Sequence, residues 1–111
     1  MKKVHFDRLA KTAILLYFLA EEKEPINMAN YRQCDGTLAC AFGWAALMFP
    51  KIKWPGGYVP LFNGQHGIMA VAEFYGLTFS KAQHIFGMSY EKDPKVPADR
   101  IIKLLGASSA E

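Results

Sequence analysis

Two cysteines and two histidines are the side chains best suited to chemistry in this sequence: Cys34, Cys40, His66 and His84. If Thr37 caps a helix, Cys40 lies near the start of that helix, where the pKa of a thiol is lowered. With His66 or His84 as its base, Cys40 would then be the nucleophile of a thiol-dependent enzyme. This enzyme is the third of three functional hypotheses.

The neighbours of Cys40 favour a structural role instead. Leu38, Ala39, Ala41 and Phe42 are all apolar, and apolar surroundings raise the pKa of a thiol. Buried cysteine is also a common small core residue. We therefore expect Cys40 to belong to the core, and we predict no catalytic residue and no enzymatic activity.

The same four side chains are of the types that bind zinc in Cys2His2 sites. Structural zinc sites place their ligands in pairs, about two to four residues apart. Neither the pair Cys34 and Cys40 nor the pair His66 and His84 has this spacing. The sequence therefore predicts no metal site and no cofactor.

Residues 68–87 are similar to a helix-turn-helix, with Gly76 at the turn and apolar Ala82 and Ile85 in the second helix. Glutamine in such a helix can read adenine in the major groove, and lysine can contact guanine or phosphate. Four side chains would face the groove, and of these only Lys81 is cationic. Because attraction to phosphates supplies most non-specific affinity for DNA, this low charge counts against DNA binding. A DNA-binding regulator is thus the alternative function. Its reading residues would be Ser80, Lys81, Gln83 and His84.

Several large apolar side chains lie in the loop from Trp54 to Phe62, among glycines and prolines. Loops run over the protein surface, so such side chains are unexpected there. They either fold back as a lid over the core or form a recognition surface, since Trp and Tyr dominate interface hot spots. We predict that Trp54, Tyr58 and Phe62 bind a partner, with Phe62 the most buried of the three.

Composition limits the chain to one soluble domain. Of its 111 residues, 51% are hydrophobic and 21% are charged, which is ordinary for a globular protein. The net charge of +3 is spread along the chain and gives only slight support to nucleic-acid binding. Two cysteines are too few for a disulfide scaffold, and no convincing signal peptide begins the chain. We expect a cytoplasmic protein.

The stretch from Gly36 to Pro50 contains no charged residue and is apolar on every face. A helix of this kind must be enclosed on all sides, and it is too short for a membrane span of about 20 residues. We therefore predict a central helix over about Thr37–Phe49, with Thr37 as its cap. The fold class that follows is all-α, with five or six short helices in a single domain over residues 1–106.

Apolar spacing and stop residues predict the other elements. The first helix carries apolar residues from Phe6 to Ala20, has Asp7 in its first turn and is stopped by Pro25. The remaining expected elements are a helical turn at 26–31, a small hairpin around Pro55–Gly56, a helix over Gln65–Tyr75 stopped by Gly76, a helix capped by Thr78 or Ser80 and ended by Gly87, a last helix from Pro97 to Gly106, and a frayed tail over 107–111.

The segment Cys34-Asp-Gly-Thr-Leu-Ala-Cys40, followed by Ala-Phe-Gly-Trp-Ala, resembles a motif of small, uncharacterised bacterial and phage proteins. In that motif a Cys-Gly-Thr stretch leads to a second Cys and then to Gly-Trp-Ala or Gly-His-Ala. Asp35 departs from the commoner spacing. The resemblance extends from about Asn27 onward and implies a compact helical fold and a phage or prophage setting, but no particular activity.

We expect binding rather than catalysis, because no recognisable catalytic set is present. We predict a small cytoplasmic interaction module that binds a host or partner protein, without a cofactor and without membrane contact.

Overall fold

The computed structural model describes residues 1–26, 40–57, 59–87 and 92–108. This part of the chain is a mostly helical single domain, as predicted, and it also contains one small two-stranded sheet that was not predicted. Its elements are α1 (Lys3–Glu21), α2 (Ala41–Ala45), the 3-10 helix η1 (Ala46–Met48), β1 (Leu61–Phe62), β2 (Gln65–His66), α3 (Gly67–Tyr75), α4 (Phe79–Phe86) and α5 (Lys95–Ser108).

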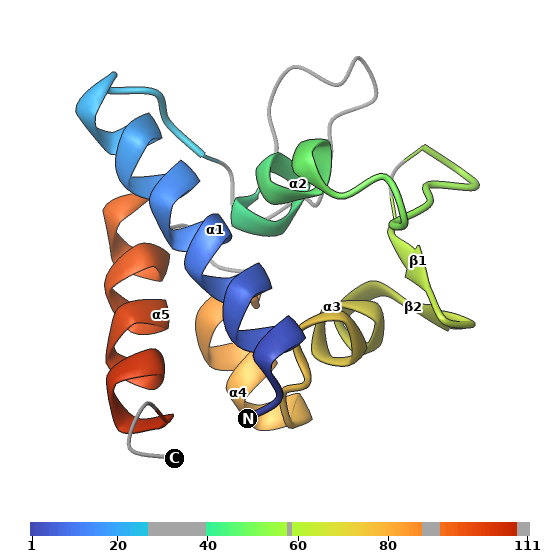
Figure 1. Ribbon diagram of the computed structural model, residues 1–111. Coiled ribbons are helices and arrows are strands. Elements are labelled where there is room, and N and C mark those ends of the chain that lie inside the picture. The colour runs from blue at the N-terminus through green and yellow to red at the C-terminus, as the bar shows by residue number, and fades with distance from the viewer. Residues whose placement is uncertain (27–39, 58, 88–91, 109–111) are drawn as a thin grey trace.

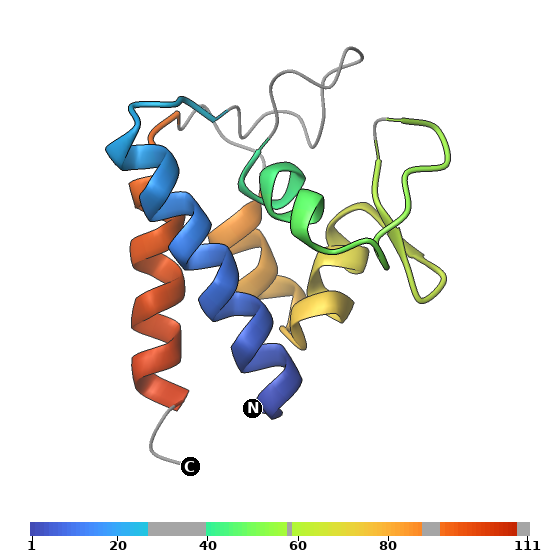
Figure 2. The ribbon, with the colours of Figure 1, turned by 45° about the horizontal axis from the view of Figure 1, so that its top comes forward.

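Helix α1 is the element around which the others are arranged. It lies antiparallel to α5 in both views and also contacts α2 and α3 (Figures 1 and 2). Apolar residues at helical spacing predicted the inner face of α1, and the prediction holds for Leu9, Ala13 and Leu16, whereas Phe6, Ala10, Tyr17 and Ala20 are only partly buried. The side chains buried on this face are Leu9, Thr12, Ala13, Leu16 and Leu19.

The predicted central helix is shorter than expected within the described residues. It begins at Ala41, after Cys40 as its N-cap, and tightens into η1 at Ala46; residues 37–39, including the expected cap, lie outside the described part. The α2 residues are largely buried, as expected, but Leu47 on η1 is 75% exposed. Enclosure on all sides is therefore wrong for η1, where Ala46 is buried but Leu47 and Met48 are exposed.

The core contains an aromatic cluster to which α2, α3 and α4 all contribute, packed among aliphatic side chains. The Phe42 ring meets Phe74, Tyr75 and Phe86 edge-on, at centroid distances of 6.1, 5.8 and 6.2 Å. Tyr75 and Phe86 stack in parallel at 4.9 Å. Edge-to-face and stacked pairs of this kind add to the stabilisation from burial. The described part of the uncharged stretch from Gly36 to Pro50 therefore contributes to the core through Phe42, as expected.

The loop before α3 reverses direction twice. A bridge between Lys53 and Leu61 closes the segment around Pro55–Gly56, as expected. A second reversal, which was not predicted, joins β1 to β2 through Asn63 and Gly64, whose φ values of 49° and 77° are those of a type I′ turn.

Stop signals located most helix ends correctly. Gly76 ends α3 in the left-handed conformation, with φ of 64°. The Thr78 hydroxyl accepts a hydrogen bond from the Lys81 backbone N–H at 3.2 Å and caps α4, which ends before Gly87. The prediction for Gly106 is wrong, because α5 continues past it to Ser108.

Within the described ranges, no helix has the length and apolar character needed to cross a membrane.

Candidate functional site

Cys40 is the N-cap of α2 and not a residue within its first turn, as a cap at Thr37 would have required, and its thiol is buried. Burial raises the pKa of Cys40 from 9.0 to about 11, although the backbone N–H groups of Gly43 and Phe42 act in the opposite direction. Burial therefore outweighs the helix start, and the thiol stays protonated at neutral pH. This state is the opposite of what a nucleophilic cysteine needs. Cys34 lies outside the described residues.

The two histidines do not share the surroundings of Cys40. His66 lies on β2 and His84 on α4, and both side chains are exposed. Among the described residues, no group of three or more His, Cys, Asp and Glu side chains could hold a metal ion.

The loop from Trp54 to Phe62, which we call the aromatic loop, packs partly against the core. Trp54 and Phe62 are half-buried next to the core cluster, and the Phe62 ring lies edge-on to Phe74 at 5.1 Å. Tyr58 lies outside the described residues. The two described side chains thus act in part as a lid, and partner binding by Trp54, Tyr58 and Phe62 stays a prediction.

The α4 residues considered for DNA reading share one exposed face. Ala82, Ile85 and Phe86 point into the core. The side chains on the opposite, exposed face are Ser80, Lys81, Gln83 and His84. Near the end of α4, the Arg100 guanidinium donates a hydrogen bond to the His84 carbonyl at 2.9 Å, which joins α4 to α5.

Two large apolar side chains on the outer face of α1 were missed by the sequence analysis. Ile14 is 69% exposed and Phe18 is 59% exposed, and they lie one helical turn apart. Both residues fall outside the apolar spacing that predicted the buried face of α1, which is the signal that could have found them.

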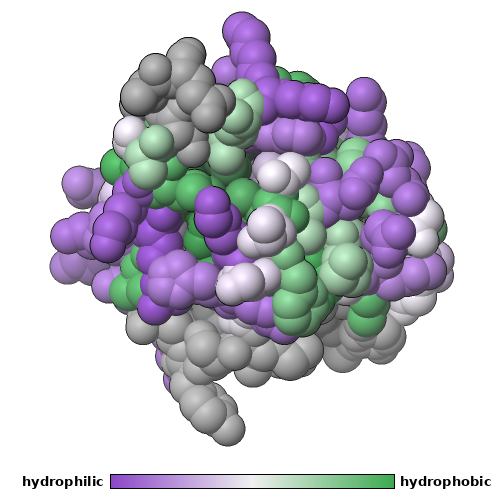
Figure 3. Space-filling view, turned by 90° about the horizontal axis from the view of Figure 1, so that it is seen from below, coloured by the Kyte–Doolittle hydropathy of each residue, from purple (hydrophilic) through white to green (hydrophobic). Residues whose placement is uncertain are grey.

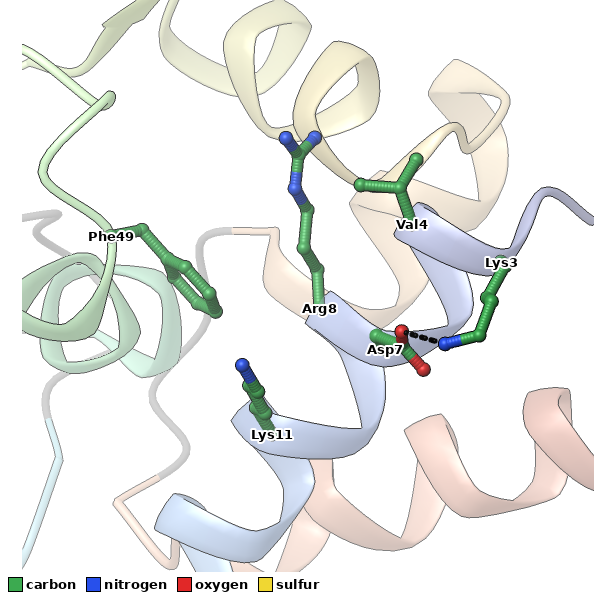
Figure 4. Close-up of a pocket in the computed structure, with 6 residues that line it drawn as sticks. All are labelled: Lys3, Val4, Asp7, Arg8, Lys11 and Phe49. Carbon is green, nitrogen blue, oxygen red and sulfur yellow. Dashed lines mark hydrogen bonds and ion pairs between the residues drawn. The ribbon is translucent and has the colours of Figure 1, made fainter.

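Basic residues gather around two hollows at the beginning of α1. The first hollow, of about 510 Å³, is lined by Lys3, Val4, Asp7, Arg8, Lys11 and Phe49 (Figure 4). The second, of about 450 Å³, is lined by Lys2, His5, Arg8, Lys51, Phe62, Asn63, Glu73 and Gly76. Arg8 lines both hollows and joins them into one surface. Seen from the end where α1 begins, hydrophilic and apolar residues are interspersed on this face (Figure 3).

Arg8 is held in place by groups on α3 and β1. Its Nη1 donates a hydrogen bond to the Phe74 carbonyl at 2.8 Å. Its guanidinium carbon lies 4.2 Å from the Phe74 ring centroid and 5.5 Å from that of Phe62, within the range of cation–π attraction. The charge of Arg8 is therefore fixed between the two hollows.

Comparison of the chain with protein-family models, curated proteins and solved structures finds no match.

Proposed function

We propose that this chain is a small interaction module that binds a partner protein through the outer face of α1. The observation that carries the proposal is the joint exposure of Ile14 and Phe18 on adjacent turns. Large apolar side chains that stay exposed together mark interaction sites more often than isolated ones do. Phe18 and Ile14 would be the anchors that enter pockets on the partner.

Helix α1 offers these anchors on a rigid support. The Tyr17 hydroxyl donates a hydrogen bond to the Asp99 carboxylate at 2.5 Å and ties α1 to α5. On the other side, Arg8 ties α1 to α3. A rigid helix loses little conformational entropy when it binds, so more of the contact energy appears as affinity.

The aromatic loop would have a supporting role in this proposal. Trp54 and Phe62 use part of their surface on the core, which leaves less of it for a partner.

The cellular setting is part of the proposal. The resemblance of the Cys34–Ala45 segment to a motif of small bacterial and phage proteins supports a phage or prophage setting, and we include a cytoplasmic location.

Pull-down experiments that use the parent and matched variants as baits test the proposal. The bait proteins are the parent, Ile14→Ser with Phe18→Ser, and a control with Phe79→Ser and Ile102→Ser. The control removes the same two residue types from α4 and α5, where they are 52% and 47% exposed.

A protein captured by the parent and the control, but lost with the α1 variant, supports the proposal. Equal capture by all three baits contradicts it. Melting temperatures of the three baits should be similar, because each substituted side chain is about half exposed or more.

A DNA-binding regulator remains the second candidate. The common exposure of Ser80, Lys81, Gln83 and His84 on a capped helix favours it, because a reading helix must present several polar side chains to base edges together. Lys81→Glu with Gln83→Ala should abolish DNA binding and leave the fold intact.

A further inference from the structure

The charges of α1 run against its helix dipole. Lys2 is the N-cap and Lys3 follows it, while Glu21 ends the helix and Glu22 is its C-cap; the first turn holds no acidic residue and the last turn no basic one. A helix start favours negative charge and a helix end favours positive charge. Asp7, expected in the first turn, lies in the second because α1 begins at Lys3. Such an arrangement indicates that positive charge at this end serves something other than helix stability.

Cations from separate segments meet at this end of the molecule. The two hollows contain five of the chain's 13 lysines and arginines, but Asp7 and Glu73 are their only acidic lining residues. Asp7 pairs with Lys3 at 2.8 Å. Among the described residues, no carboxylate pairs with the remaining cations. We call these four the basic surface: Lys2, Arg8, Lys11 and Lys51.

The first hollow lies between α1 and the residue that follows η1. The Lys11 and Arg8 side chains extend from neighbouring turns of α1 on the side where Phe49 faces them, while Lys3 and Asp7 pair on the other side (Figure 4). The Lys3–Asp7 pair therefore leaves the charges of Lys11 and Arg8 uncompensated.

His5 bounds the second hollow on the side of the turn between α3 and α4. A Cβ added at Gly76 would overlap the His5 ring, so the ring packs directly on the turn. Burial, and then the charges of Arg8 and Lys2, lower the pKa of His5. Burial is the largest of these causes, and the two positive charges add to it while Glu73 opposes them.

We propose that the basic surface binds the phosphodiester backbone of a nucleic acid strand. Phosphates are contacted mainly by arginine and lysine, and several separate cations suit a ligand that carries several separate phosphates. An acidic protein segment fits less well, because lysine is depleted in protein–protein interfaces. Phe49 and Phe62, the aromatic residues of the hollows, also pack edge-on against Phe74. The inference goes beyond the proposed function and does not depend on the reading face of α4.

Binding of fluorescent oligonucleotides to matched charge variants tests this inference. The probe is an oligothymidine of about 20 nucleotides, with a mixed-sequence duplex as a second arm. Lys11→Gln with Lys51→Gln removes two charges from the basic surface. Lys95→Gln with Lys103→Gln removes two exposed charges from α5 and produces the same net charge. A third variant, Lys81→Glu with Gln83→Ala, tests α4.

We expect the parent to bind one or both probes at low salt, with affinity that falls as salt rises. The Lys11 and Lys51 variant should bind about tenfold more weakly and should lower the salt slope by about 0.7 per lost contact on a single strand. The α5 control should bind like the parent. All four proteins should melt at the same temperature, since the changed side chains are exposed.

Several outcomes overturn the inference. One is the absence of binding to both probes at low salt. Another is an equal loss in the α5 control, which would indicate a net-charge effect. A loss confined to the α4 variant would assign binding to the second candidate function instead. Equally tight binding of polyglutamate, with the same loss in the Lys11 and Lys51 variant, would indicate an acidic protein partner.

Discussion

The Thr12 and Tyr75 hydroxyls form a hydrogen bond of 2.7 Å in the core, where both side chains are fully buried. Thr12 also donates its hydroxyl hydrogen to the Arg8 carbonyl at 2.8 Å. Tyr75 must therefore be the donor to Thr12. This bond and the one from Arg8 to the Phe74 carbonyl fix α1 against α3, which positions both the outer face of α1 and the basic surface.

Substitution of the two hydroxyl groups should give unequal, non-additive losses of stability. Tyr75→Phe removes a donor and should cost about 1 kcal/mol, whereas Thr12→Val leaves the tyrosine hydroxyl unsatisfied and should cost about 1–3 kcal/mol. The double variant should lose less than the sum, because no buried hydroxyl is then left without its partner. Urea unfolding of the four proteins measures the cycle, and strict additivity would contradict the bond.

Cys40 should react slowly with thiol reagents in the native state and quickly after denaturation. Its pKa of about 11 keeps the folded thiol protonated, and burial blocks access. Rapid native labelling at neutral pH would restore the thiol-enzyme hypothesis.

The same pKa predicts a loss of stability in alkali. The unfolded thiol releases its proton near the ordinary pKa of 9.0, and the folded thiol near 11. Between these values the unfolded state binds fewer protons. The contribution of Cys40 is thus fully present below pH 9 and falls as the pH rises toward 11. The difference in unfolding free energy between the parent and Cys40→Ala should shrink across this window, and a constant difference would contradict the burial of the thiol.

Gly76→Ala should destabilise the protein more than Gly64→Ala. Both glycines have positive φ, at 64° and 77°, which costs an alanine about 1–2 kcal/mol. Space around Gly64 is open, whereas a Cβ at Gly76 meets the His5 ring. His5→Ala should therefore rescue part of the Gly76→Ala loss and none of the Gly64→Ala loss. Equal melting temperatures for the two glycine variants would exclude the close contact with His5.

Truncation of the aromatic loop should separate its lid role from its binding role. Phe62→Ala removes the ring contact with Phe74 and part of the Arg8 contact, and should cost about 2–3 kcal/mol, below the 3–5 of a fully buried ring. Trp54→Ala should cost less than this if its remaining surface serves a partner. A Trp54→Ala loss larger than that of Phe62→Ala would identify Trp54 as a lid residue.

Local signals were enough to predict α1, α3 and α4. Their apolar residues recur at helical spacing, and Gly76 and Thr78 act on the backbone next to them. The early end of α2 and the exposure of Leu47 depend on tertiary packing, which no local pattern records. The Asn63–Gly64 reversal is a two-residue turn signal, but the strands on either side contain only two residues each and show no alternating pattern.

The basic surface could not be predicted because it combines distant segments. Lys51 joins Arg8 and Lys11 only after the loop following η1 folds back toward α1. The sequence shows the same lysines as charges dispersed along the chain. Ile14 and Phe18 differ from the basic surface, because both lie on α1 and their positions outside the apolar spacing of its inner face were visible in the sequence.

At Lys2, the N-cap of α1, the stability of the helix and the charge of the basic surface favour different residues. Lys2 makes no side-chain cap hydrogen bond, and an Asp or Ser at this position typically adds about 1 kcal/mol of helix stability. Selection of the chain for thermostability should therefore recover substitutions at Lys2 early. Each of these substitutions would remove a cation from the basic surface. A variant selected for thermostability should therefore bind an anionic ligand with lower affinity than the parent does.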